Sequence, residues 1–109
     1  MANTFKLKTK ANVGVTTVGI YTAPAATTTV VIGITMANTS GSGGNVVVGI
    51  TRAGTTEDVK LLKNAPIPQG SSLEFMAGNK VVLEATDTVT VDSDTNNSID
   101  AALTIMEIT

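Results

Sequence analysis

The chain has 109 residues and a net charge of -2, and only 15% of its residues are charged. This length fits a single domain spanning residues 1–109, and the weak negative charge gives no field that attracts a nucleic-acid backbone. No apolar run is long enough to cross a bilayer, and the N-terminus lacks the apolar core of a secretory leader. We therefore expect neither a nucleic-acid nor a membrane partner.

Cysteine and histidine are both absent. Disulfides, thiolate metal sites, imidazole ligands and the commonest general base are thereby excluded. The charged fraction is also well below the roughly 25% of an average soluble domain. Threonine, serine, asparagine and small apolar side chains must cover much of the surface, and we expect another subunit to cover part of it.

The first predicted element is residues 4–10, TFKLKTK, in which Phe5 and Leu7 alternate with three lysines. This alternation predicts a strand that buries its apolar face and exposes its ammonium groups. Lysines protect an exposed sheet edge from pairing with other chains. Residues 1–10 are therefore either such an edge strand or an arm that docks on an acidic neighbour. The three lysines are Lys6, Lys8 and Lys10.

Three apolar, β-branched segments follow: VGVTTVGIY, TTTVVIGITMANT and NVVVGITRA, separated by TAPAA and TSGSGGN. Such runs bounded by Gly, Pro, Asn and Ser predict strands, and Tyr21 at the first boundary is interpreted as a strand-end anchor. SGSGG (residues 40–44) is interpreted as a hairpin connection. Both faces of these strands are poor in charge, which predicts cover on each side or a subunit contact. In the second segment alternation places Val30, Ile32, Ile34 and Met36 on one face, and in the third it places Val46, Val48 and Ile50 opposite Val47.

The second half continues the strand pattern. Pro66 and Pro68 predict a stiff extended linker at which the chain crosses between sheets, and residues 77–80 and 84–87 are predicted turns. In TVTVD, Val89 and Val91 are expected to point inward. The last strand is expected to be buried on both faces, with Ile99, Ala101, Leu103 and Ile105 on one side and Ala102, Met106 and Ile108 on the other.

Residues 92–100 read DSDTNNSID, rich in oxygen-bearing side chains. A calcium-binding EF-hand loop would use Asp92, Asp94 and Asn96 as ligands, but its twelfth position, which requires a bidentate carboxylate, is Leu103. Asp and Asn also favour turns. We interpret the stretch as a hairpin connection, with a calcium site as the alternative.

Together, eight or nine short strands without helical spacing predict an all-β fold: a two-layer antiparallel β-sandwich, for which a jelly roll is one arrangement. No pair of carboxylates shows the spacing of acid–base catalysis, and no histidine can activate a hydroxyl. We therefore expect no catalytic residue, no cofactor and no enzymatic activity. A sugar-binding module is an alternative, although the chain has only three aromatic residues for stacking on sugar rings, and Phe5 and Phe75 fit core positions.

The segments IYTAPAATTTVVIGITMANTS, VKLLKNAPIPQGSSLEF, NKVVLEATDTVTVDSD and SIDAALTIMEIT resemble small virion structural proteins of tailed bacteriophages over roughly residues 12–109. The resemblance implies a β-sandwich module that coats or joins parts of the particle. It favours a capsid decoration or cement protein, with a tail, neck or adaptor component as one alternative and a glycan-binding adhesin module as another. The implied partners are further copies of the chain, a trimer being one arrangement, and virion proteins such as the major capsid protein. The interface candidates are Phe5, Lys6, Lys8, Lys10, Val47, Met106 and Ile108.

Overall fold

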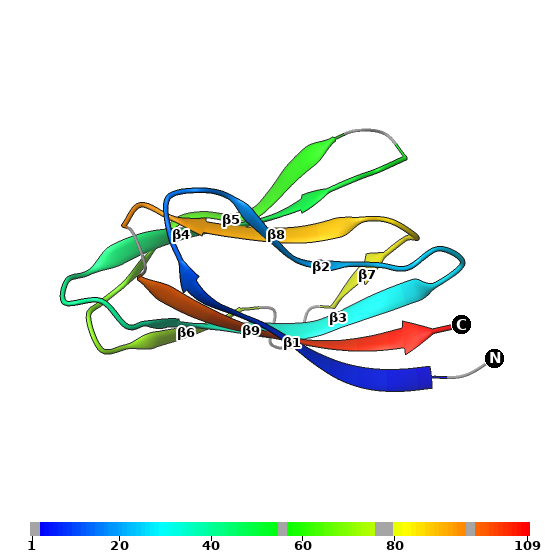
Figure 1. Cartoon of the computed structure of the whole chain (residues 1–109), viewed down its shortest axis with the longest axis horizontal. Coiled ribbons are helices and arrows are strands. Elements are labelled where there is room, and N and C mark those ends of the chain that lie inside the picture. Colours follow the sequence, from blue (N-terminus) through cyan, green and yellow to red (C-terminus); the bar gives the residue numbers. More distant parts are fainter. Residues whose placement is uncertain (1–2, 55–56, 76–79, 96–97) are drawn as a thin grey trace.

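The computed structural model describes residues 3–54, 57–75, 80–95 and 98–109. Two antiparallel sheets pack face to face (Figure 1), which confirms the predicted all-β sandwich. In strand order, one sheet is β1-β9-β3-β6, with β7 also pairing with β3, and the other is β2-β8-β4-β5. The strands are β1 (Asn3–Val13), β2 (Val18–Thr22), β3 (Thr28–Asn38), β4 (Gly44–Thr51), β5 (Asp58–Ile67), β6 (Ser72–Phe75), β7 (Val81–Leu83), β8 (Thr88–Ser93) and β9 (Ile99–Ile108).

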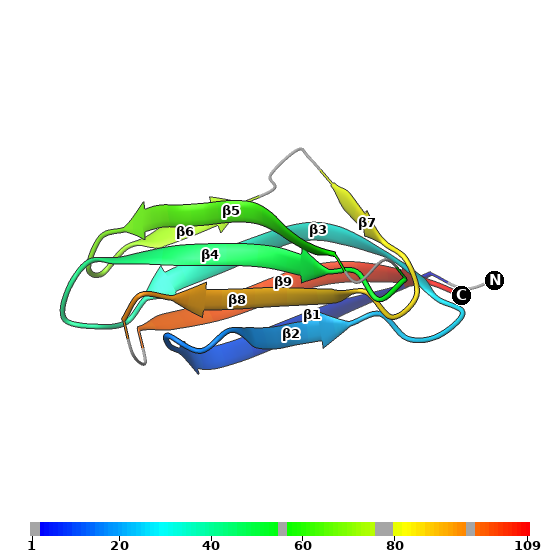
Figure 2. The ribbon, with the colours of Figure 1, turned by 90° about the horizontal axis from the view of Figure 1, so that it is seen from above.

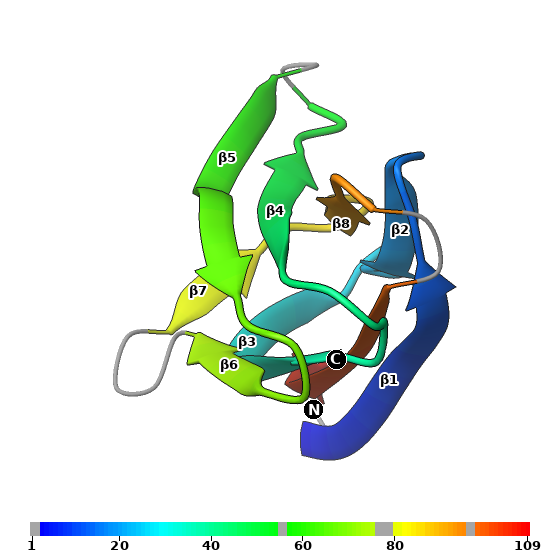
Figure 3. The same cartoon turned by 90° about the vertical axis from the view of Figure 1, so that its left-hand side faces the viewer.

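We call the sheet that contains β1 the first sheet and the one that contains β2 the second. Strands that follow one another in the chain repeatedly occupy the same position in the strand orders of the two sheets. β1 has the same position as β2, β3 as β4, β6 as β5 and β9 as β8. The chain thus passes from layer to layer instead of folding into successive hairpins, as Figures 2 and 3 show from two further sides. This is the strand order of a jelly roll, with β6 and β7 sharing one place beside β3.

This topology corrects two hairpin predictions. The SGSGG segment joins β3 in the first sheet to β4 in the second, and the segment after Asp92 joins β8 in the second sheet to β9 in the first. Both are therefore crossings between the layers. Gly and Asn indicate only that the chain turns, and the pairing of the flanking strands is decided by tertiary packing.

The proline segment behaves partly as expected. The chain does cross between sheets after Pro68, because β5 lies in the second sheet and β6 in the first. However, Pro66 lies within β5, opposite Asn45, and is not part of the linker. A proline is tolerated there because β5 is an edge strand.

The first strand is oriented opposite to the prediction. β1 is an edge strand paired with β9, so residues 3–10 are not a detached arm. Lys6 lies beside the inward-facing Ile105, whereas Phe5 lies beside the outward-facing Met106. Phe5 is therefore 69% exposed and not a core residue. The alternation was correct, but an amphipathic edge strand can turn either face outward, and a buried acceptor for Lys6 selects this one. The side chain of Phe75 lies outside the described residues.

A β-bulge corrects the faces predicted for β3. The register with β9 shifts between Val31 and Gly33, which adds one residue and reverses the alternation beyond it. Ile34 and Met36 therefore point into the core with Val31, while Val30 faces outward. The predicted inward positions of β4, β8 and β9 are confirmed, but the opposite face of β9, which was expected to be buried as well, is turned outward and is half-buried at Ala102, Met106 and Ile108. The residues least exposed in the core are Ala23, Met36, Val46, Leu83, Val91, Ile99, Leu103 and Ile105.

Candidate interaction surface

The outer face of the first sheet carries an exposed apolar row. Phe5, Met106, Val30 and Val82 are register partners across β1, β9, β3 and β7, so they lie side by side. Phe5 is 69% and Val82 59% exposed, and the neighbouring Leu7 is 65% exposed. With Ile108 in the adjacent row, they form what we call the apolar end of this face. Contiguous apolar surface of this kind marks interaction sites.

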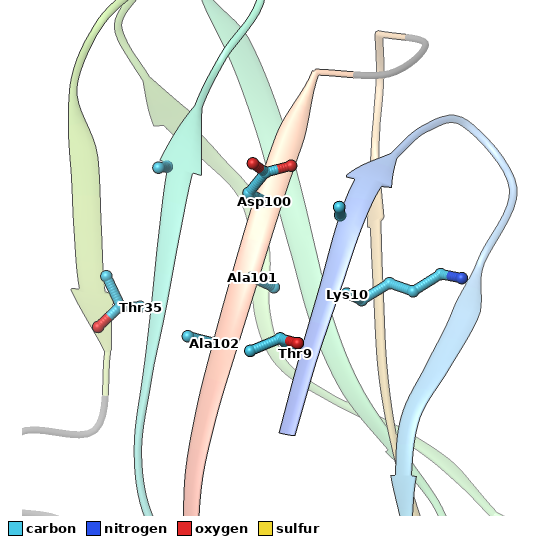
Figure 4. A pocket seen from close by; sticks show the side chains of 8 residues that line it. Thr9, Lys10, Thr35, Asp100, Ala101 and Ala102 are labelled. Atoms are coloured by element: carbon cyan, nitrogen blue, oxygen red, sulfur yellow. The ribbon is translucent and has the colours of Figure 1, made fainter. Parts of the chain in front are cut away.

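The other end of the same face is a shallow hollow of about 370 Å³. Its outward side chains are small, so the strand backbones lie close to the surface (Figure 4). Lys10 contributes to the rim, but its side chain extends past β1 toward β2. The one carboxylate in the lining, Asp100, accepts a 2.9 Å hydrogen bond from the Asn12 backbone N–H. The other lining residues are Thr9, Ala11, Thr35, Ala37, Ala101 and Ala102.

The outer face of the second sheet differs in character. Thr88, Thr90 and Asp92 occupy the outward positions of β8, and Asp92 accepts a 3.1 Å hydrogen bond from the Thr17 hydroxyl. Val47, paired with Asp92, is a single outward apolar residue in these polar surroundings. The interface candidates therefore do not form one surface. Phe5, Met106 and Ile108 share the first sheet's outer face, Val47 lies on the opposite side, and the lysines face the space between the layers.

A buried polar cluster explains the orientation of the lysines. Glu107 points inward from β9 with its side chain 8% exposed, and Lys6 Nζ lies 2.8 Å from its Oε1. The Tyr21 hydroxyl donates a 2.6 Å hydrogen bond to Glu107 Oε2 and lies 2.8 Å from the Thr29 hydroxyl. Lys8 Nζ lies 6.0 Å from the centre of the Tyr21 ring. The cluster links β1, β2, β3 and β9, which confirms Tyr21 as an anchor at the end of β2.

The protonation behaviour of the cluster follows from these contacts. The hydrogen bonds from Lys6 and then Tyr21 hold the pKa of the Glu107 carboxyl below its ordinary value, despite its burial. Burial, followed by the hydrogen bond to Glu107, raises the pKa of Tyr21 to about 12. The carboxylate is thus ionised and the phenol neutral at neutral pH. In these protonation states the Glu107 carboxylate and the Tyr21 hydroxyl each have a hydrogen-bonding partner, so the cluster can hold the two sheets together.

A second buried carboxylate organises the turn at residues 84–87. Asp87 is 2% exposed and accepts a 3.0 Å hydrogen bond from the Glu84 N–H and a 3.3 Å one from the Ala53 N–H. Arg52 Nε lies 2.9 Å from Asp87, and its guanidinium also pairs with Glu84. The predicted turn is confirmed, and its aspartate proves to join the β7–β8 turn to the end of β4. Neither Glu107 nor Asp87 was predicted from the sequence. Glu107 could have been predicted, because an acidic residue at an inward position of an otherwise apolar strand is unusual.

The proposed calcium ligands have protein partners where they are described. Asp94 Oδ1 accepts hydrogen bonds from the Asn45 N–H at 2.9 Å and the Thr95 hydroxyl at 3.1 Å, and Asp92 bonds Thr17. Asn96 lies outside the described residues. Within those residues, no group of three or more acidic, His or Cys side chains is placed to hold a metal ion. Over the same part of the chain, no helix is long and apolar enough to span a membrane.

Comparison with known proteins identifies the fold. No protein-family model matches the chain, and no curated protein matches it significantly. Among solved structures it is similar to a chain of the Bacillus endospore appendages, described as disulfide-linked pili, with 16% identity and a TM-score of 0.57, covering 99% of this chain and 87% of that one. It is also similar to a chain from the capsid of Helicobacter pylori bacteriophage KHP30, with 9% identity, a TM-score of 0.59 and coverage of 100% and 94%.

A third similar structure comes from infectious bursal disease virus, Gx strain, with 12% identity and a TM-score of 0.53. The match covers 96% of this chain but 36% of the viral one, so the present chain spans about a third of that longer protein. Identities this low show a shared fold. That fold occurs in chains from a bacteriophage capsid, the infectious bursal disease virus and Bacillus endospore pili.

Proposed function

We propose that the chain is a non-enzymatic structural subunit of a bacteriophage virion, and that within the particle it is a capsid decoration or cement protein. The observation that carries the proposal is the outer face of the first sheet, where Phe5, Leu7 and Val82 are each more than half exposed. A surface of this kind favours a chain that works inside an assembly. Few formal charges oppose its burial, because 15% of the residues are charged.

The length of the similar KHP30 capsid chain also supports the proposal. The KHP30 capsid chain is covered over 94% of its length by this 109-residue chain, so the two are nearly equally long. A subunit this small offers a limited area for any single contact. Binding at many lattice positions multiplies modest contacts into high avidity, which is how a small module can reinforce a shell.

A filament subunit is the second candidate, favoured by the likeness to the endospore appendage chain over 99% of this sequence. This chain has no cysteine and cannot form the disulfide links by which those pili are described. Filament assembly would therefore have to depend on non-covalent contacts. A tail, neck or adaptor position and a glycan-binding module remain further alternatives.

Copy number distinguishes these roles. The ratio of this chain to the major capsid protein is measured in purified particles by quantitative mass spectrometry with labelled standard peptides. A ratio near one, or near a fixed lattice fraction, is expected for a decoration protein, whereas a few copies per particle would place the chain in the tail or neck. Absence from particles, with recovery from cell-surface filaments, would overturn the virion proposal in favour of the filament.

A reconstitution experiment tests the cement role directly. Purified chain is added to undecorated shells, and binding and resistance to heat are measured. Shells that bind the chain and dissociate at a higher temperature are expected. A Phe5→Ser/Leu7→Ser variant should bind more weakly, and a Val47→Ser variant, altered on the opposite face, is the matched control. Unchanged shells would contradict the cement role, and equal losses in both variants would contradict the choice of face.

A further inference from the structure

We infer that the outer face of the first sheet binds the same face of a second copy, in a two-fold arrangement that places the apolar end of each copy over the hollow of the other. This inference builds on the proposed structural role and names a second copy as the partner of its main surface. Shells would then be bound by dimers, and Phe5→Ser/Leu7→Ser would bind them more weakly because a linked pair binds with higher avidity than a single copy. Its physical basis is that one face carries both large protruding side chains and a hollow lined by small ones.

The two halves of the face are complementary in shape. At the apolar end, Phe5, Met106, Val30 and Val82 form a row across four strands. At the hollow, Thr9, Ala102 and Thr35 form the corresponding row across β1, β9 and β3. Packed layers fill space when large side chains of one layer meet small ones of the other. Placing two apolar ends together would instead leave both hollows empty.

This complementarity between large and small side chains determines how the two copies are related by symmetry. The apolar end meets the hollow in both directions only if the copies are related by a two-fold axis near the middle of the face. Thr104 of β9 lies there, between the two rows, with Leu7 and Gly33 as its register partners. An interface that uses the same patch on both subunits is closed, so the predicted product is a dimer and not an open chain.

The available area is sufficient. β1 and β3 each have 11 residues and β9 has 10, which at about 3.4 Å per residue gives a face roughly 35 Å long. Four strand positions spaced about 4.8 Å apart make it roughly 19 Å wide. Each copy then contributes about 650 Å², and the pair about 1,300 Å², which is within the range of stable specific interfaces.

Charge and polarity favour this face over the others. Among its described outward strand positions, the formal charges are those of Asp100, whose Oδ1 is already bonded to a backbone N–H, and of Glu74 on β6, the register partner of Thr35; both lie at the hollow, and the outward strand positions of the apolar end carry none. The opposite face of the sandwich presents Thr88, Thr90 and Asp92, together with the Lys60–Asp58 ion pair. Interface cores are depleted in charge, so two apolar faces are the better match.

Sedimentation velocity of the purified chain tests the inference. A monomer–dimer equilibrium is expected in the micromolar range. Phe5→Ala/Leu7→Ala should raise the dissociation constant at least about tenfold, as removal of apolar anchors does. Ala102→Phe should do the same by filling the hollow, without altering the inward face of β9. Val47→Ala, on the other sheet, should leave the equilibrium unchanged, and circular dichroism should show that all four proteins are folded.

Cross-linking tests the two-fold axis independently. Because the chain has no cysteine, a Thr104→Cys variant has one thiol per copy, and a bis-maleimide can span the roughly 10 Å between packed sheets. Efficient cross-linking is expected for Thr104→Cys and not for Ile108→Cys, which lies far from the axis. The reverse pattern, a larger oligomer or a strictly monomeric chain would overturn the inference.

The two proposals fail separately. A chain that is monomeric in solution but abundant in particles would contradict the dimer and leave the virion role intact. The apolar end would then bind another virion protein. A dimer with the predicted cross-link that is absent from particles would leave the surface assignment intact and overturn the virion role.

Discussion

The Tyr21 hydroxyl donates a 2.6 Å hydrogen bond to Glu107, 86 residues away in sequence and in the opposite sheet. The same carboxylate pairs with Lys6 of the edge strand β1. One buried acid therefore holds together the two ends of the chain and the two layers of the sandwich. It also accounts for the outward position of Phe5, because Lys6 and Phe5 must occupy opposite faces of β1.

Tyr21 should titrate abnormally. Burial and the carboxylate partner raise its pKa to about 12, so its phenolate absorbance should have a midpoint near pH 12, and near the ordinary value of about 10 in denaturant. As the only tyrosine in a chain without tryptophan, it gives an unambiguous signal. Glu107→Gln should lower the midpoint part of the way, since burial, the largest cause, remains. A native midpoint near 10 would contradict the placement of this hydroxyl.

Glu107 should make the free energy of unfolding depend on pH in the acidic range. Its pKa is held below the ordinary value, chiefly by Lys6, so its stabilising contribution is present above the unfolded pKa of about 4.3 and is lost as pH falls through the lowered folded pKa. Glu107→Gln should reduce the free energy of unfolding at pH 7 by about 1 to 2 kcal/mol, because Lys6 is partly hydrated. The difference between the two proteins should shrink below pH 4. Urea unfolding measures it, with the exposed Glu74→Gln as the control; a pH-independent difference would contradict this role.

Removal of the Asp87 carboxylate should lower the stability of the fold far more than removal of an exposed aspartate. Asp87→Ala leaves two backbone N–H groups and the Arg52 guanidinium without this acceptor, which should cost about 3 kcal/mol. Asp58→Ala removes an exposed pair with Lys60 and should cost less than about 1 kcal/mol. Thermal unfolding of both variants decides the comparison, and equal losses would show that the buried turn contributes little.

Gly49 should not tolerate a side chain. A Cβ there would lie 2.9 Å from the Val59 carbonyl oxygen and 3.2 Å from the Thr90 hydroxyl. Backbone cannot yield as a flexible side chain can, so Gly49→Ala should destabilise the fold by about 1 to 3 kcal/mol. Gly54→Ala meets nothing within 4 Å and is the matched control. A neutral Gly49→Ala would mean that β4 and β5 lie further apart.

The aspartates near the β8–β9 crossing should stabilise the chain without calcium. Asp94→Ala removes the acceptor of the Asn45 N–H and should cost about 1 kcal/mol in metal-free buffer. Added calcium should not change the melting temperature of the unmodified chain. A calcium-dependent rise that Asp92→Ala or Asp94→Ala abolishes would instead support the calcium alternative.

The sequence by itself determined the class of fold and the position of most strands. Val46, Val48 and Ile50, like Val89 and Val91, alternate strictly, and period-two alternation is a local property that the backbone pleat converts directly into an inward face. Turn residues likewise located the chain reversal at residues 84–87, because Asp and Thr adopt turn geometry locally. Composition alone excluded imidazole and thiol chemistry, because the chain contains neither histidine nor cysteine.

Only the tertiary structure decided which strands pair, which way β1 faces and where the candidate surface lies. The alternation in TFKLKTK allows two orientations, and the choice depends on Glu107, about a hundred residues away in sequence. The bulge at Ile32 reverses the faces of β3 without a local signal. A hollow of alanines and threonines beside a row of large apolar side chains exists only once β1, β9 and β3 are in register, because it is a property of neighbours across strands and not along the chain.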